Sequence, residues 1–280
     1  MTGPRTFHFV FGLKAQNAPF HLAHYLALAS CIRHHDGARV VMHHGEVPHG
    51  PWWDRIRPHL ELRPVERVGW LDDHPGYFAH DEGRLIVGAG YDYAHQADVI
   101  RLEVLAAEGG IYADIDTLFV DEVPRSYDHE RFVIGEEDVG ARRRRPRRSL
   151  CNAFMAATAG SRFALRWLDR IRDVFDGTWS RHSCTEAALL AAEMPGEVTV
   201  VSTRPHCAFP ATAKGLGDLF ERRVDVRDGV VSIHWWEHLW WSPLRSDFTS
   251  FHNGLLTEEY VLGADTTFAR LARPTLLDPP

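Results

Sequence analysis

Two aspartates stand one residue apart in the segment GGIYADIDTLFV, which begins at Gly109. On an extended segment, residues two positions apart face the same side, so Asp114 and Asp116 can converge on one ligand while Ile115 points into the core. Two close carboxylates repel one another unless a cation lies between or beside them, and a divalent ion that prefers oxygen ligands meets that need. The pattern predicts a site for Mg²⁺ or Mn²⁺. An aspartate that caps a turn beside a solvated aspartate is the alternative interpretation.

A helix is expected directly before the two glycines. The segment YAHQADVIRLEVLAAEGG carries an apolar stripe, and Gly109 with Gly110 makes a natural C-terminal stop. Asp98 and Arg101 lie three residues apart on this helix and therefore share one face. Taken alone, they could form a modest surface ion pair.

The block ADVIRLEVLAAEGGIYADIDTLFV as a whole resembles the DXD sugar-binding region of a large glycosyltransferase family. That family includes Golgi initiating mannosyltransferases, bacterial capsular polysaccharide glycosyltransferases and the glucosylating domains of large clostridial toxins. Its pattern is approximately A-x-D-x-x-R, an apolar helix, then G-G-[IV]-Y-x-D-x-D, with the alanine one residue farther from the first aspartate in some members. The matching residues are Ala97, Asp98, Arg101, Gly109, Gly110, Tyr112, Asp114 and Asp116. This set at fixed spacing is far more specific than two aspartates alone.

The resemblance implies a role for each polar residue of the block. Asp98 and Arg101 would hydrogen-bond hydroxyls of a donor sugar, and Asp114 would reach the ribose or the sugar beside the metal. Asp116 would bind the metal that bridges the diphosphate. Tyr112 would pack near the donor, with an ordinary core tyrosine as the alternative. As a Lewis acid, the ion would neutralise the charge that develops on the departing nucleoside diphosphate.

Two further segments resemble the family more weakly. FHFVFG resembles the opening strand, usually I-H-x-x-W-x-G, whose backbone and aromatic side chain contact the base. Phe9 and Val10 would then contact the donor, and Phe11 stands where tryptophan is common. CNAFMAATAGSRF resembles the segment after the DXD strand that begins with a donor-contacting asparagine and continues into a helix. Asn152 would bind a sugar hydroxyl, or alternatively cap that helix.

A third segment, VSIHWWEHLWWSP, resembles the late strand that completes the metal site in related metal-dependent transferases. His234 is the expected ligand and His238 the reserve, since either offers a neutral imidazole to a manganese-like ion. Trp235 would line the diphosphate. An aromatic-rich core strand with a polar end is the alternative.

These residues require elements that bring them together. The amino-terminal part shows a β-α-β-α-β rhythm, which favours a mainly parallel sheet covered by helices, with ligands at the carboxyl ends of its strands. Strands are expected at 6–12, 38–44, 61–66, 111–120, 131–138, 198–202 and 229–236, and helices from Asn17 and Pro19 through about His35, at 51–60, 161–176, 184–193 and past Thr257. With the resemblance, this implies a single Rossmann-like α/β glycosyltransferase type-A domain with helical additions. Residues 1–120 would bind the nucleotide sugar, and residues 121–280 would bind the acceptor and complete the metal site.

Composition restricts the class of protein further. The formal net charge of −7 argues against a protein coated for nucleic acid. No stretch approaches the roughly 18 apolar residues of a membrane span, so no integral membrane segment is expected and a cytoplasmic location is the default. The cysteines show no CxxC spacing, which disfavours a zinc knuckle. The arginine run at 142–148 is either a solvated loop or a contact for an anionic acceptor.

The expected function is therefore metal-dependent, retaining transfer of a hexose or N-acetylhexosamine from a UDP- or GDP-linked sugar to a hydroxyl acceptor, in polysaccharide biosynthesis. No nucleophile or base is identified. One alternative is a haloacid-dehalogenase-like phosphatase, because DIDTLFV resembles its D-x-D-x-T start. That motif usually lies near the amino terminus and is followed by a lysine and a paired acidic motif, whereas Lys214 is the only lysine after it in this chain. A non-catalytic nucleotide-sugar-binding protein is the other alternative.

Overall fold

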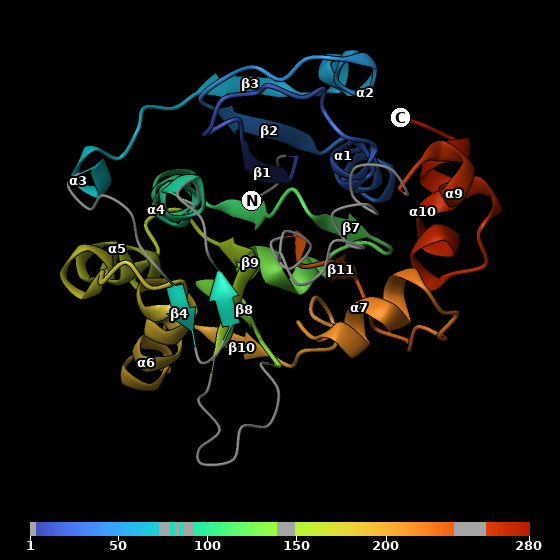
Figure 1. Ribbon diagram of the computed structural model, residues 1–280. Coiled ribbons are helices and arrows are strands. Elements are labelled where there is room, and N and C mark those ends of the chain that lie inside the picture. The colour runs from blue at the N-terminus through green and yellow to red at the C-terminus, as the bar shows by residue number, and fades with distance from the viewer. Residues whose placement is uncertain (1–3, 73–78, 82–83, 87–91, 139–148, 238–255) are drawn as a thin grey trace.

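A seven-stranded sheet with helices on both faces forms the centre of the computed structural model (Figure 1). The structure describes residues 4–72, 79–81, 84–86, 92–138, 149–237 and 256–280. In spatial order the strands are β10 (Thr199–Val201), β8 (Phe132–Glu136), β9 (Leu150–Ala157), β6 (Gly110–Ala113), β1 (Thr6–Phe11), β2 (Arg39–His44) and β3 (Glu61–Pro64). Strand β9 runs antiparallel to both neighbours, and every other pair in this sheet is parallel. The predicted mainly parallel α/β sheet is confirmed.

The helices form two layers, each with its own apolar cluster (Figure 1). On one face, α1 (Leu22–His34) buries ten consecutive residues, as expected of a helix that is apolar all round. On the other face, α4 (Asp92–Glu108) packs on the sheet, and the amphipathic helix α5 (Arg162–Val174) packs against α4. The other helices of these layers are α6 (Glu186–Glu193), which packs on α5, α10 (Thr267–Leu277), which packs on α1, and α7 (Ala213–Phe220) and α9 (Glu258–Gly263), which pack on α10. Helices α9 and α10 form the helical segment expected past Thr257, whereas no helix was expected at 213–220.

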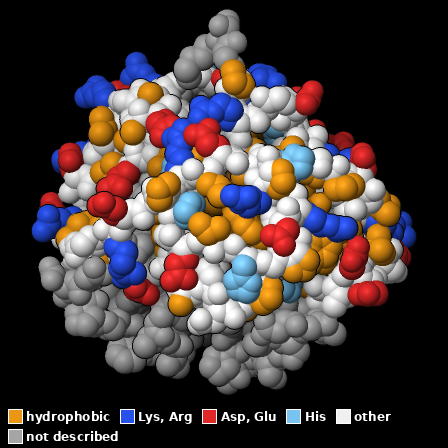
Figure 2. All heavy atoms as spheres, turned by 90° about the horizontal axis from the view of Figure 1, so that it is seen from above, with side chains coloured by type: hydrophobic (Ala, Val, Ile, Leu, Met, Phe, Trp, Pro, Cys, Tyr) orange, Lys and Arg blue, Asp and Glu red, His pale blue; other side chains and the backbone are white. Residues whose placement is uncertain are grey.

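Short elements complete the described chain. They are α2 (Pro51–Ile56), η1 (Arg57–His59), α3 (Gly69–Asp72), β4 (Ala79–Asp81), β5 (Arg84–Ile86), η2 (Arg125–His129) and the π-turn η3 (Arg181–Thr185). Within the described ranges, no helix is both long and apolar enough to cross a membrane. Basic and acidic side chains are intermixed on the face of the molecule that lies over the β3 edge (Figure 2).

The segment expected as one strand at 111–120 is two strands in two sheets, so that prediction was wrong. Strand β6 ends at Ala113, the chain turns at Ile115 and Asp116, and β7 (Thr117–Phe119) begins a separate pair. Its antiparallel partner is β11 (Ser232–His234), with His234 opposite Thr117. The two aspartates therefore converge through a turn between two sheets rather than through the pleat of one strand.

One helix start differs from the sequence prediction, and another agrees with it. Helix α1 begins at Leu22 and not near Asn17, because the His21 imidazole accepts a hydrogen bond from the amide of Ala23 at 3.2 Å and caps the helix. The helix expected at 161–176 is α5, which Ser161 caps, and the residues from Cys151 to Ala157 belong to β9. Asn152 lies inside the strand and caps no helix.

The two glycines after α4 work as predicted, and their surroundings show why. Gly109 has a φ of 69° and Gly110 a φ of 94°, a backbone region that other residues rarely adopt. A Cβ atom on Gly109 would lie 2.5 Å from the amide nitrogen of Ala159, and one on Gly110 would lie 2.8 Å from the carbonyl oxygen of Thr6. The glycines thus end the helix and let β6 enter the sheet directly.

Candidate functional site

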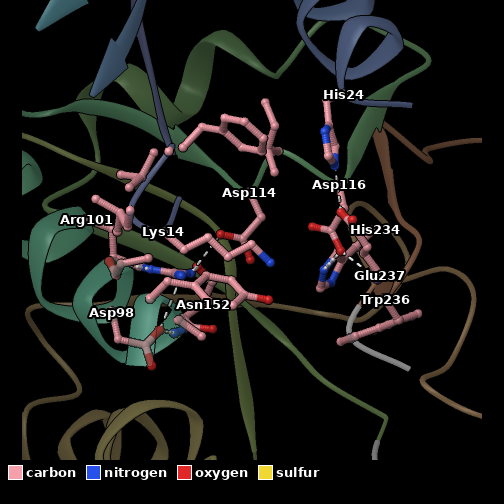
Figure 3. Close-up of a pocket in the computed structure, with 18 of the residues that line it drawn as sticks. Lys14, His24, Asp98, Arg101, Asp114, Asp116, Asn152, His234, Trp236 and Glu237 are labelled. Atoms are coloured by element: carbon pink, nitrogen blue, oxygen red, sulfur yellow. Dashed lines mark hydrogen bonds and ion pairs between the residues drawn. The ribbon is translucent and has the colours of Figure 1, made fainter. Parts of the chain in front are cut away.

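A cavity of about 360 Å³ opens at the carboxyl ends of β1 and β6, where ligands bind in parallel α/β sheets. Its lining comes from the end of β1, from α1 and α4, from the turn between β6 and β7, from β9, and from β11 with the residues after it. Figure 3 shows the charged side chains in two groups, one around Arg101 and one around Asp116.

The first group is centred on the Arg101 guanidinium. Its Nη1 lies 3.0 Å from Asp114 Oδ1 and donates to the carbonyl oxygen of Asn152 at 2.7 Å, and its Nη2 lies 3.2 Å from Asp98 Oδ1. The guanidinium carbon lies 4.6 Å from the centre of the Tyr112 ring, whose hydroxyl donates to Asp114 Oδ1. The Asn152 amide donates to Asp98 Oδ1 at 2.7 Å. The predicted sugar contacts thus form one hydrogen-bonded cluster.

Charge pairing keeps this cluster ionised although it is buried. Burial alone would raise the pKa of Asp98, but the charge of Arg101 and the hydrogen bond from His182 outweigh it and hold that pKa well below its usual range. Burial would lower the pKa of Arg101, but Asp114 and Asp98 raise it. Burial raises the pKa of the Tyr112 hydroxyl well above its ordinary value, so Tyr112 stays a donor.

The second group joins Asp116 to His234. His234 Nε2 lies 3.0 Å from Asp116 Oδ2, and the amide of Glu237 donates to the same oxygen at 2.8 Å. Burial would lower the pKa of His234, but the Asp116 carboxylate raises it well above its ordinary value, and the imidazole in turn lowers the pKa of Asp116 against the effect of burial. Without an ion these two groups therefore form a buried ion pair.

The residues present fit a divalent metal ion. One ligand atom each of Asp114, Asp116 and His234 can be chosen so that all three lie within 4.8 Å of one another. Burial raises the pKa of Asp114, against the opposing charge of Arg101, and the nearby Asp116 raises it further. A divalent cation would relieve that repulsion, although it would have to displace a proton from His234. Two carboxylates and one imidazole form a donor set that suits Mn²⁺.

Most of the predicted site residues line the cavity, and two do not. The residues that line it are Val10, Asp98, Arg101, Tyr112, Asp114, Asp116, Asn152 and His234. Phe9 is fully buried in the core, and Trp235 is fully buried with its ring 5.6 Å from that of Phe268. Trp236 lines the cavity in place of Trp235. His238 and the arginine run at 142–148 lie outside the described residues.

The cavity also contains titratable residues that the sequence prediction missed. His24 Nε2 lies 2.9 Å from Glu237 Oε2, next to the Asp116 group (Figure 3). The Lys14 ammonium lies 4.2 Å from the centre of the Tyr93 ring, and burial lowers its pKa. A sequence signal existed for two of them, because Glu237 follows His234 closely and Lys14 is one of two lysines in the chain.

Comparison with known proteins gives a family and a relative. Residues 24–133 match the family described as a glycosyltransferase sugar-binding region containing a DXD motif. The chain is 32% identical over 213 residues to Glucan organizing enzyme 1 of Cryptococcus neoformans var. grubii. The match covers 73% of this chain and 54% of the relative, so the chain spans about half the length of that curated relative.

Three solved structures with similar backbones are named as glycosyltransferases. PaToxG Glycosyltransferase is 14% identical with a TM-score of 0.47, and the match covers 97% of this chain and 87% of that one. The galactosyltransferase LgtC in complex with donor and acceptor sugar analogs is 13% identical with a TM-score of 0.44, covering 91% and 98%. The glycosyltransferase GlyE of Streptococcus pneumoniae is 8% identical with a TM-score of 0.46, covering 98% and 63%.

Proposed function

Because residues 24–133 of this chain match the family of glycosyltransferase sugar-binding regions that contain a DXD motif, we propose that the protein is a metal-dependent glycosyltransferase. The observation that carries the proposal is the convergence of two groups in one cavity, a sugar-binding cluster around Arg101 and an aspartate-histidine pair at Asp116. The fold would be of glycosyltransferase type A.

Each group has a distinct task in this proposal. Asp98 accepts, and Arg101 and Asn152 donate, hydrogen bonds to hydroxyls of the donor sugar, which fixes the sugar at one end of the cavity. Asp116, His234 and Asp114 would hold Mn²⁺ or Mg²⁺, with Mn²⁺ favoured by the imidazole. When bound, such an ion supplies positive charge for the diphosphate as it leaves. Lys14, which lines the same cavity, adds a protein cation for an anionic donor.

The donor is a hexose or N-acetylhexosamine linked to UDP or GDP, and the acceptor offers a hydroxyl. The name of the Cryptococcus relative refers to glucan, so we take a polysaccharide hydroxyl as the acceptor class. Transfer would retain the anomeric configuration, as in the family that the sequence resembles. Residues 1–120 would supply most donor contacts, and residues 121–280 would supply Asn152 and His234. A cytoplasmic location stays a prediction from the sequence.

Replacing Asp116 by Asn tests the proposal. The variant removes the charge that would hold the ion but keeps an oxygen that can accept from His234 and from the Glu237 amide. We expect Mn²⁺-dependent transfer and donor hydrolysis to fall on the order of a hundredfold or more, with unchanged circular dichroism. Donor binding is measured by thermal shift with UDP- and GDP-linked sugars, with and without Mn²⁺.

Asp265→Asn is the matched control, because Asp265 is exposed and far from the cavity lining. That variant should keep wild-type activity. Near wild-type activity in Asp116→Asn would refute the proposal. Mn²⁺-dependent phosphate release from simple phosphate esters, without any response to nucleotide sugars, would favour the phosphatase alternative. Donor binding without transfer or hydrolysis would favour the non-catalytic alternative.

A further inference from the structure

The π-turn η3, Arg181–Thr185, lies directly behind the sugar end of the cavity. π-Helical turns are rare and occur frequently at functional sites. Ser183 and Cys184 of this turn line the cavity, whereas His182 is 1% exposed and does not. Any effect of His182 on a bound sugar must therefore act through another residue.

His182 touches the residue that is proposed to bind the donor sugar. Its Nε2 lies 3.0 Å from Asp98 Oδ2, across 84 residues of sequence. Asp98 is ionised, as its lowered pKa indicates, and an ionised carboxylate can only accept hydrogen bonds. His182 Nε2 therefore carries the hydrogen and donates it to Asp98. His95 Nδ1 lies 4.0 Å from the same oxygen, too far to donate to it, and 3.1 Å from His182 Nε2, so it can accept from the same N–H group.

Two donors and one ion pair hold the Asp98 carboxylate in one orientation. Asn152 donates to Oδ1, His182 donates to Oδ2, and Arg101 Nη2 forms an ion pair with Oδ1 at 3.2 Å. A carboxylate offers about four lone-pair positions, so it can still accept from a sugar hydroxyl. Without His182, Oδ2 would lose its protein donor and the carboxylate could rotate about its bond to the Cβ atom.

The turn itself is held rigidly. Glu186 is fully buried and lies between two arginines, with Oε1 2.7 Å from Arg170 Nε and Oε2 2.5 Å from Arg181 Nη1. The Trp167 indole donates to the carbonyl oxygen of His182 at 2.9 Å. Two residues after His182, the Cys184 thiol lies 3.6 Å from Asn152 Oδ1. One turn thus contacts both members of the Asp98–Asn152 pair.

We propose that His182 is a positioning residue, which fixes the Asp98 carboxylate in the orientation that accepts a hydroxyl of the donor sugar. This inference rests on the proposed function, because it concerns the sugar end of the same site. It also predicts that His182 acts on the sugar and not on the nucleoside diphosphate, which would be held at the Asp116 end.

Two substitutions of similar size test this role. In His182→Gln, the side-chain amide nitrogen can take the place of Nε2 and donate to Asp98, whereas in His182→Asn the amide nitrogen takes the place of Nδ1 and cannot reach. We expect His182→Asn to lower kcat/KM for the nucleotide sugar about ten- to a hundredfold, as for loss of a hydrogen bond to a charged group. His182→Gln should stay within about threefold of wild type. The affinity for UDP and for GDP with Mn²⁺ should be unchanged in both variants.

The affinity for UDP and for GDP separates a positioning role from a structural one. If both variants have equal kcat/KM, or if His182→Asn weakens UDP or GDP binding as much as it weakens the nucleotide sugar, the inference is wrong. If the wild-type protein binds a nucleotide sugar and both variants match it, the inference fails while the proposed function stands. A wild-type protein that responds to no nucleotide sugar would refute both.

Discussion

Trp236 is the described non-glycine residue with a left-handed backbone, at a φ of 56°. Such a conformation costs roughly 1–2 kcal/mol for an ordinary residue and is found where the surroundings enforce it. Here the indole donates to the carbonyl oxygen of Phe209 at 2.8 Å, and the ring centre lies 4.1 Å from that of His234. The strained residue therefore fixes an aromatic ring against the predicted metal ligand at the edge of the cavity.

Neighbouring tryptophans allow a matched test of this placement. We expect Trp236→Phe to raise the KM for the nucleotide sugar roughly three- to tenfold, because it removes the hydrogen bond to Phe209 and part of the cavity lining. Trp235→Phe should leave the kinetics unchanged and lower the free energy of unfolding by about 1–3 kcal/mol, since that ring is in the core. Steady-state kinetics and urea denaturation of both variants provide the measurements. The opposite assignment of effects would show that Trp235 is the one that contacts the donor.

The sequence could have identified Trp236 without the structure. The alternation of an extended segment would place Trp236 on the side of His234 and Trp235 in the core. The structure places both rings so, although β11 ends at His234 and Trp236 has a left-handed backbone. Helical spacing likewise grouped Asp98 with Arg101, whereas Asp114 and Asp116 come together through the turn after β6 and not through the strand spacing that predicted them. No local pattern could find His182, because its contact with Asp98 depends on how α5 and the π-turn pack against α4.

At the scale of elements, strands and helices with strong local signals agree closely with the sequence prediction. Strands β1 and β2 and helix α4 have periodic apolar residues and clear ends, and their bounds differ little from those expected. The prediction failed where tertiary contacts decide. Residues 111–120 were expected as one strand, but they form β6 and β7, and the partner of β7 is β11, which lies far away in the sequence.

Gly109 and Gly37 share a φ of 69° but differ in their surroundings, which gives an element-scale prediction. A Cβ on Gly109 would meet the backbone of Ala157 and Ala159, whereas a Cβ on Gly37 would meet nothing within 4 Å. Gly37→Ala should therefore cost only the backbone strain, about 1 kcal/mol. Gly109→Ala should cost roughly 2–4 kcal/mol, because it adds a backbone clash.

Urea denaturation of the two glycine variants measures both costs. The comparison emphasises the contact, because φ is the same at the two positions. Equal destabilisation by the two substitutions would show that close packing of β6 against β9 does not require glycine at position 109.

At the scale of the whole molecule, several buried histidines determine how stability depends on pH. Burial lowers the pKa of His8, His35 and His43 to about 4 and that of His206 to about 3. In the unfolded chain each would titrate near 6.5. Below that pH the unfolded state binds protons that the folded state does not bind. The contribution of these histidines to the free energy of unfolding is therefore fully present above about pH 6.5 and is lost as the pH falls toward 4.

We therefore expect the free energy of unfolding to decrease between pH 6.5 and 4.5, with each such histidine contributing up to about 1.4 kcal/mol per pH unit. Urea denaturation at half-unit pH steps measures the slope. His206→Asn is the informative variant, because Asn can keep the hydrogen bond that His206 Nδ1 makes with Ser232 while it removes one titrating group. Its slope should be shallower than that of wild type. A wild-type stability that is constant over this range would contradict the prediction.

The pairing of β7 with β11 also has a consequence for the order in which the protein acquires its site. Asp116 and His234 are 118 residues apart, and β11 is the last strand of the described chain. During synthesis, all seven strands of the large sheet leave the ribosome before His234 does. Contacts that close long loops generally form late in folding. The aspartate pair must therefore exist for a time without its imidazole, and competence to bind a metal ion should be among the last properties that the folding chain gains.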